Sequence, residues 1–268
     1  MDAECKFIEV NDHIAQLNIG PGSYVVKGAD RALVVDTGYG RENHREYVES
    51  YTDLPLVLAC THSHFDHVRG NVFYDSCLLN PADFDIYDMM FDFEQVPEQF
   101  RSLRPCRPSP IHDGDVIDLG GRHVEAIWTP GHTPGSTCFL DVEARVLITG
   151  DTVLHDTTWL LFPYSLTVED HNESLKKLAS MRSRFDYLLT GHTVGLQPVS
   201  LLDELLEASN AILEGKTERA GIYNFGQRSG LPCYYYGDWN GPLVYREGHI
   251  FKDGHYCLPR KTACGGQC

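Results

Sequence analysis

Histidine and aspartate residues follow several short apolar runs of this chain, each at the point where the run ends. The densest group is THSHFDH, residues 61–67, directly after the apolar run Leu56–Cys60. The others are His132 after AIWTPG, Asp151 after LITG and His192 after LLTG. Short apolar runs bounded by turns predict buried strands, and open α/β sheets gather their ligands at the carboxyl ends of strands. We therefore expect a sheet system with one edge that collects these side chains.

The rest of the chain alternates between strand-like and helix-like patterns. Amphipathic stretches predict helices over residues 168–185 and 198–213. Short apolar or alternating runs predict further strands at Val25–Val26, Ala32–Val35, Val116–Leu119, His123–Trp128 and Thr137–Leu140. This alternation indicates the α/β class, and no repeat of solenoid period interrupts it.

Composition excludes several kinds of partner. The chain has 268 residues, enough for a substantial core, and its formal net charge of -16 repels nucleic acid and anionic lipid. No apolar run approaches the roughly 20 residues of a spanning helix, and the charged N-terminus does not resemble a signal peptide. The nine cysteines are an odd number without a framework spacing. We expect a cytoplasmic protein that acts on a small molecule and binds neither nucleic acid nor membrane.

The spaced histidines and aspartates form an inventory suited to metal binding. Three imidazoles, on His62, His64 and His132, make one set. Asp66, His67 and His192 make a second, and Asp151 remains to bridge the two. Such sets suit two zinc-like ions about 3.5–4 Å apart, each with a position open to water. The remaining histidines have no ligand-type spacing and are expected on the surface or in the core: His13, His44, His112, His123, His171, His249 and His255.

These residues also carry a family resemblance. THSHFDH, GHTPGS, the Gly150–Asp151 and Gly191–His192 pairs, and VVDTG at residues 34–38 occur in the order of the metallo-β-lactamase-fold superfamily. The resemblance implies a four-layer αββα sandwich with a metal site at one edge of two sheets. It implies a hydrolase domain over residues 1–215, and we expect residues 216–268 to be an extension packed on it with a flexible tail. It also implies that Asp36 is structural and supports the loop of metal ligands.

The implied activity is hydrolysis. Two divalent ions, zinc by preference and iron or manganese as alternatives, would supply a metal-bound hydroxide, and Asp66 would bind one ion and orient that hydroxide. The aspartate at position 151 resembles the glyoxalase II and lactonase branch more than the true β-lactamases. We therefore expect a small acyl ester, thioester or lactone as substrate. The alternatives are a β-lactamase or phosphodiesterase using the same site, and a di-iron redox or oxygen-handling protein.

Two segments are candidates for the substrate pocket. Residues 80–110 are rich in aromatic and methionine side chains, and Met90 and Phe91 are expected to line an acyl pocket, although the insert could equally be helical packing. His155 is a further candidate contact, although its position is equally typical of a surface residue. Residues 234–256 predict a strand or hairpin that adds a pocket wall or a subunit contact in a homo-oligomer.

Overall fold

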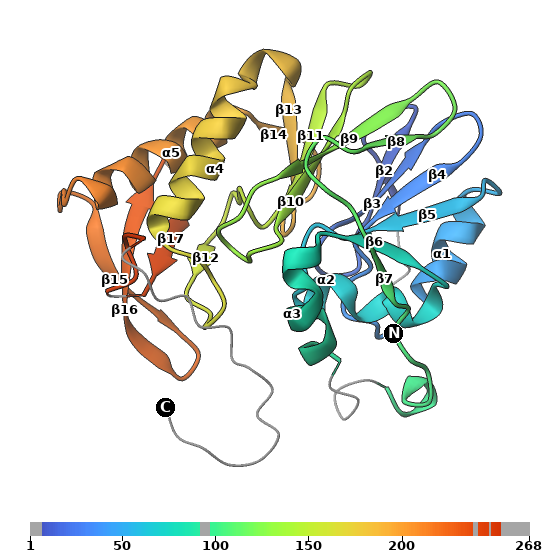
Figure 1. The fold of residues 1–268 in the computed structure, drawn as a ribbon, viewed down its shortest axis with the longest axis horizontal. Helices are drawn as coiled ribbons and strands as arrows, with labels where there is room; N and C mark the ends of the chain where they lie inside the picture. The colour runs from blue at the N-terminus through green and yellow to red at the C-terminus, as the bar shows by residue number, and fades with distance from the viewer. Residues whose placement is uncertain (1–6, 92–96, 238–240, 247, 253–268) are drawn as a thin grey trace.

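The computed structural model describes residues 7–91, 97–237, 241–246 and 248–252. Its centre consists of two sheets packed face to face, with α1, α2 and α3 against one and α4 and α5 against the other (Figure 1). This is the αββα order that the resemblance implied. The end of the expected flexible tail, residues 264–268, and residues 92–96 of the aromatic-rich segment 80–110 lie outside the described residues.

The first sheet has seven strands in sequential order. It is antiparallel from β1 to β4 and parallel from β4 to β7. Because β4 and β5 are parallel, Asp36 and the THSHFDH motif leave the sheet at the same edge. The strands are β1 (Phe7–Glu9), β2 (Ile14–Leu17), β3 (Ser23–Lys27), β4 (Ala32–Val35), β5 (Leu56–Ala59), β6 (Cys77–Leu79) and β7 (Pro108–Pro110).

The second sheet has six strands in the order β14-β13-β11-β10-β9-β8. Its β11 and β13 are parallel neighbours, and Gly150 pairs with Thr190, so Asp151 and His192 follow adjacent strand ends. The strands are β8 (Val116–Asp118), β9 (His123–Trp128), β10 (Thr137–Asp141), β11 (Val146–Gly150), β13 (Tyr187–Thr190) and β14 (Gln197–Pro198).

Alternating side chains of the strands build three apolar layers. In β3, Val26 points into the layer between the two sheets, and Val25 points into the layer beneath α1 and α3. In β11, Ile148 joins the central layer and Leu147 joins the layer beneath α4 and α5. The two sheets are therefore covered on both faces, which explains why their strands read as nearly continuous apolar runs.

The helices are α1 (His44–Tyr51), α2 (Phe65–Val68), α3 (Phe84–Met89), α4 (Val168–Ser180) and α5 (Ser200–Leu213). A capping box between Thr167 and Asp170 starts α4, and the helix ends at Ser180, earlier than the predicted residue 185. The remaining turns are 3₁₀ segments at Arg69–Phe73, Pro81–Asp83, Glu98–Phe100 and Arg182–Arg184. Within the described residues, no helix combines the length and apolar character needed to cross a membrane.

A third sheet lies beside α5 and was not predicted as a sheet (Figure 1). Its strands, in spatial order, are β12 (Thr158–Leu160), β17 (Gly241–Tyr245), β16 (Arg228–Tyr236) and β15 (Ala220–Phe225). Tyr236 and Leu243 of this sheet belong to the same apolar cluster as Leu205 of α5. The C-terminal strands thus pack on the preceding fold, and β17 pairs directly with β12.

Candidate metal centre and substrate pocket

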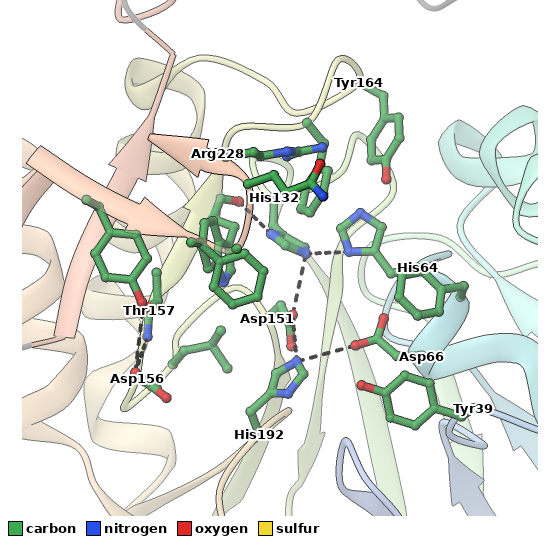
Figure 2. A pocket seen from close by; sticks show the side chains of 18 residues that line it. Tyr39, His64, Asp66, His132, Asp151, Asp156, Thr157, Tyr164, His192 and Arg228 are labelled. Carbon is green, nitrogen blue, oxygen red and sulfur yellow. Dashed lines mark hydrogen bonds and ion pairs between the residues drawn. The ribbon is translucent and has the colours of Figure 1, made fainter. Parts of the chain in front are cut away.

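The first group of ligand-type side chains consists of His62, His64, His132 and Asp151. All four are buried, and one donor atom from each lies within 4.8 Å of the others. His64 Nδ1 is 2.8 Å from His132 Nε2, and His132 Nε2 is 3.5 Å from Asp151 Oδ2. Figure 2 shows His64, His132 and Asp151 converging on one space from different elements. Three imidazoles and a carboxylate at these separations are a donor set that suits zinc.

The second group consists of Asp66, His67 and His192, whose donor atoms also lie within 4.8 Å of one another. His192 Nε2 is 3.2 Å from Asp151 Oδ2 and 3.8 Å from Asp66 Oδ2. The other oxygen of Asp151 is 3.3 Å from His67 Nε2. The carboxylate of Asp151 therefore faces both groups, as a ligand shared by two ions must.

Hydrogen bonds fix which ring nitrogen each histidine presents. Thr61 Oγ1 donates to Asp36, so it accepts from His62 Nδ1 at 3.0 Å. His67 Nδ1 donates to Asp36 Oδ2 at 2.8 Å, and His132 Nδ1 donates to the carbonyl oxygen of Trp159 at 2.7 Å. Each of these bonds leaves an Nε2 lone pair directed inward. Metal-binding histidines are typically oriented in this way by a partner on the other nitrogen.

Several buried polar atoms of these two groups have no hydrogen-bond partner. Within the described part of the chain, His62 Nε2, His64 Nε2 and His67 Nε2 are buried without a hydrogen bond, and Asp151 Oδ1 faces His67 without hydrogen-bond geometry. Buried polar atoms rarely lack a partner, because desolvation without a hydrogen bond is costly. Burial also lowers the pKa of His62, His64 and His132, which keeps their lone pairs available. The residues present fit divalent cations.

Asp36 supports the ligand loop, as the Asp-Thr-Gly element implied. Its carboxylate accepts hydrogen bonds from the Thr61 amide and hydroxyl, both at 2.7 Å, and from His67. Its backbone φ is 61°, in the left-handed region that aspartate tolerates better than most residues. Asp36 therefore orients a ligand of each group through one buried side chain.

Asp83 is a second buried aspartate that the sequence analysis did not identify. Its carboxylate accepts hydrogen bonds from Ser63 N at 3.0 Å, Thr133 Oγ1 at 2.8 Å and Gly135 N at 2.6 Å. It thereby ties the loop that carries His64 to the loop that carries His132. In the sequence it lies within NPADF, where it reads only as a residue at a helix start.

The glycine of the Gly191–His192 motif has a steric explanation. A Cβ atom at Gly191 would lie 2.1 Å from Asp151 Oδ1 and 3.1 Å from His67 Cε1. Any side chain there would displace the shared carboxylate.

A cavity of about 650 Å³ opens directly over these groups. His64, Asp66, His132, Asp151 and His192 form its floor (Figure 2). Its walls carry Tyr39, Phe65, Leu154, Asp156, Thr157, Trp159, Phe162, Tyr164, Tyr223, Phe225, Gly226, Gln227 and Arg228. Aromatic walls above polar groups are typical of a site for a small organic substrate.

The side chains expected to contact substrate lie elsewhere. Met90 and Phe91 pack against the apolar cluster beneath α1 and α3 and do not line the cavity, because α3 covers the outer face of the first sheet. His155 also falls outside the lining, although Leu154 and Asp156 beside it belong to it. Met90 and Phe91 thus contribute to packing, the alternative considered for the insert. Most of the cavity wall comes instead from residues 154–164 and from the hairpin of β15 and β16, whose short aromatic runs gave no distinct signal.

Other histidines occupy the core or the surface. His44 and His171 are buried, and burial lowers the pKa of His44 to about 3 and that of His171 to about 4. His123 is exposed and contacts Glu143. His255 lies outside the described residues.

The family model described as the metallo-beta-lactamase superfamily matches residues 22–76 and 84–192, which include both ligand groups. The chain belongs to this superfamily. Solved structures agree in fold: a metallo-beta-lactamase from Pontibacter korlensis superposes with a TM-score of 0.63 at 14% identity, covering 76% of this chain and 98% of that one. A metallo-beta-lactamase family protein from Thermus thermophilus gives 0.60 at 22% identity, covering 77% and 82%. The predicted family and αββα fold are confirmed.

Three relatives with named activities are similar in sequence. Acyl-coenzyme A thioesterase MBLAC2 of Homo sapiens is 28% identical, over 63% of this chain and 71% of the relative. The atrochrysone carboxyl ACP thioesterase of Aspergillus fumigatus is 30% identical, over 63% of this chain and 50% of the relative. A probable polyketide biosynthesis zinc-dependent hydrolase, BaeB, of Bacillus velezensis is 29% identical, over 58% and 64%.

Proposed function

We propose that this chain is a metal-dependent hydrolase of acyl thioesters that uses two divalent ions, with zinc as the preferred metal. The observation that carries the proposal is the carboxylate of Asp151, which lies within 3.5 Å of imidazole nitrogens of both groups under an aromatic cavity, while His62 Nε2, His64 Nε2 and His67 Nε2 are buried without a hydrogen bond. Two of the named relatives are thioesterases and a third is a zinc-dependent hydrolase. These names support a thioester among the acyl substrates that the sequence suggested.

The assignment of ligands follows the two groups. His62, His64 and His132 would hold one ion, Asp66, His67 and His192 the other, and Asp151 would contact both. When bound, the pair of ions supplies Lewis acidity at the substrate carbonyl and acidifies a water molecule.

The remaining steps belong to this chain's own residues. The carboxylate of Asp66 lines the floor of the cavity, where it can orient a water molecule and accept a proton from it. Trp159 and Phe162 flank the floor and offer apolar surface to the acyl group. Their rings also keep bulk water from the reacting carbonyl, which strengthens electrostatic interactions there.

The test is a substrate panel with zinc-loaded and chelator-treated protein. An acyl thioester of N-acetylcysteamine, the matched oxygen ester, a lactone, a phosphodiester and a β-lactam are compared by kcat/KM. We expect the thioester to be preferred, chelation to abolish its hydrolysis, and Asp151→Ala to lower kcat/KM by roughly 10²-fold or more. Asp186→Ala, a surface aspartate paired with Arg145, is the control and should match the parent. Preference for the phosphodiester or the β-lactam would overturn the proposal.

We also propose a reducing, cytoplasmic setting. The five described cysteines, Cys60, Cys77, Cys106, Cys138 and Cys233, are free thiols and are all buried. Buried thiols without disulfides are typical of proteins in reducing compartments.

A further inference from the structure

One wall of the cavity comes from outside the segments that the family model matches. The matched residues end at 192, whereas Tyr223, Phe225 and Arg228 belong to the β15–β16 hairpin. Figure 2 shows Arg228 and Tyr164 at the opposite end of the cavity from His192, Asp66 and Tyr39. This hairpin is therefore a feature of this chain that can determine which substrate fits above the shared floor.

The wall is tied to a metal-ligand candidate through Trp159. The Trp159 ring contacts Tyr223 and Phe225, with centroids 5.5 Å and 5.2 Å apart. Its backbone oxygen accepts the hydrogen bond from His132 Nδ1. The hairpin, β12 and His132 thus form one connected unit, and a group on the hairpin has a defined position relative to the reacting centre.

Arg228 is the only lysine or arginine among the described residues that line the cavity. Its guanidinium carbon is 5.9 Å from the centroid of the Phe162 ring, and that ring is 4.8 Å from the ring of His64. The guanidinium carbon therefore lies no farther from the centroid of the His64 ring than the sum of these two distances. In the described part of the chain, Arg228 has no ion-pair partner and is exposed.

We propose that Arg228 is a specificity residue that binds a carboxylate on the acyl part of the substrate, an inference that rests on the proposed thioesterase activity. A guanidinium pairs with a carboxylate through two parallel hydrogen bonds. The acyl chain would run along Trp159 and Phe162 from the floor to the cavity rim. The net charge of -16 disfavours anionic substrates at long range, so a single lining cation has to supply the local attraction.

The upper limit on the separation of Arg228 from the His64 ring favours the acyl group over the thiol carrier as the source of the anion. In a phosphopantetheine thioester, two amide units and several further bonds separate the sulfur from the phosphate. Each amide unit alone adds roughly 3.5 Å when extended. A dicarboxylic acyl group of about five carbons matches the space between floor and guanidinium more closely.

The experiment compares glutaryl and pentanoyl thioesters of N-acetylcysteamine, which have equal carbon number and differ in the terminal carboxylate. We expect the parent to favour the glutaryl thioester about tenfold in kcat/KM, and Arg228→Gln to remove that preference through KM with little change in kcat. Arg228→Lys, which keeps the charge, should retain part of the preference. Arg145→Gln removes the same charge at the far end of β11 from Asp151 and should leave the preference unchanged.

Two outcomes overturn the assignment. One is that the parent and Arg228→Gln prefer the glutaryl over the pentanoyl thioester to the same degree. The other is an effect of Arg228→Gln that follows the phosphate of coenzyme A thioesters whatever the acyl group.

A binding measurement separates this inference from the proposed function. Quenching of tryptophan fluorescence by free glutarate and by pentanoate, measured with zinc-loaded protein, needs no turnover, and each acid has one carboxylate that the ions would attract to the floor. Tighter binding of glutarate that disappears in Arg228→Gln supports the subsite even if no thioester is hydrolysed. Equal binding of the two acids by the parent contradicts it.

Discussion

Three buried aspartates, Asp36, Asp83 and Asp151, surround this site and have different roles. Asp36 and Asp83 belong to neither ligand group but orient the loops that carry the histidines. Asp151 faces the space between the two groups, with its two oxygens 3.2 Å from His192 Nε2 and 3.3 Å from His67 Nε2. Aspartate thus supports the loops at two positions and is the proposed shared ligand at the third.

The raised pKa of Asp83 makes the stability of the fold depend on pH. Burial raises the pKa of its carboxyl from 3.8 to about 6, although hydrogen bonds from Thr133 and Gly135 oppose the shift. The folded protein then binds this proton more tightly than the unfolded chain does. The stabilisation that this bound proton gives the folded protein is complete below the pKa of the unfolded chain and is lost as the pH rises from about 4 to about 6.

Asp83→Asn removes this titration. We expect the free energy of unfolding of the parent, minus that of Asp83→Asn, to fall by about 2–3 kcal/mol between pH 4 and pH 6 and to stay level above that. Urea denaturation of chelator-treated proteins measures it, so that metal binding does not contribute. A difference that is constant from pH 4 to pH 8 would show that the carboxyl titrates normally.

The ligand-type residues could be predicted from sequence because each of them follows the end of a predicted strand. His132, Asp151 and His192 each follow an apolar run, and strand ends in paired sheets meet at one edge. Asp83 could not be predicted, because its partners on residues 63, 133 and 135 are remote in sequence and carry no pattern. Met90 and Phe91 were expected in the pocket for a related reason. An apolar side chain predicts burial, but the sequence does not show whether it is buried in a pocket or in a core layer.

At the scale of elements, the third sheet is the feature that sequence patterns could not reveal. Its β12 has only three residues and pairs in parallel with β17, more than 80 residues later in the chain. Periodicity identifies strands, but it does not identify pairing between distant short strands. The sheet matters for function because β12 carries Trp159, which connects the hairpin to His132.

Tyr236 of β16 joins this sheet to the loop after Asp151. Its hydroxyl donates to the carbonyl oxygens of Leu154 at 3.0 Å and Asp156 at 2.8 Å and lies 3.1 Å from Thr158 Oγ1. The side chain is 1% exposed, so both carbonyls would lose a buried partner in Tyr236→Phe.

We predict that Tyr236→Phe lowers the free energy of unfolding by about 1–3 kcal/mol and raises KM for the thioester, because the loop that carries cavity residues loses its anchor. Chemical denaturation and steady-state kinetics measure the two effects. Tyr187→Phe, at a tyrosine that is 48% exposed, is the matched control. A Tyr236→Phe variant as stable as this control would mean that the hydroxyl does not hold the loop.

At the scale of the whole molecule, the core is independent of the candidate metal centre. Three apolar clusters fill the layers of the sandwich, and the ligand groups lie at one edge of it. A chain of this length buries most of the surface that its unfolded state exposes. The fold therefore does not depend on ions in the way that a small zinc domain does.

Chelation should accordingly leave the fold intact while lowering its stability. We expect the far-UV circular dichroism to be unchanged and unfolding to remain cooperative. The midpoint should fall by roughly 5–15 °C, since tightly bound ions contribute about 3–4 kcal/mol at saturating concentrations. Thermal melts with and without chelator, followed by re-addition of zinc, provide the measurement. Loss of secondary structure on chelation would show that the ions are needed for folding.

The central claim is that two groups of side chains hold two ions and share Asp151. The most direct measurement is elemental analysis of purified protein after loading with zinc and dialysis. We expect about two ions per chain in the parent, about one in His62→Ala and in His192→Ala, and fewer than one in Asp151→Ala. His123→Ala, which removes an exposed histidine, should keep both ions. Two ions per chain in a double variant with His62→Ala and His64→Ala would contradict the claim.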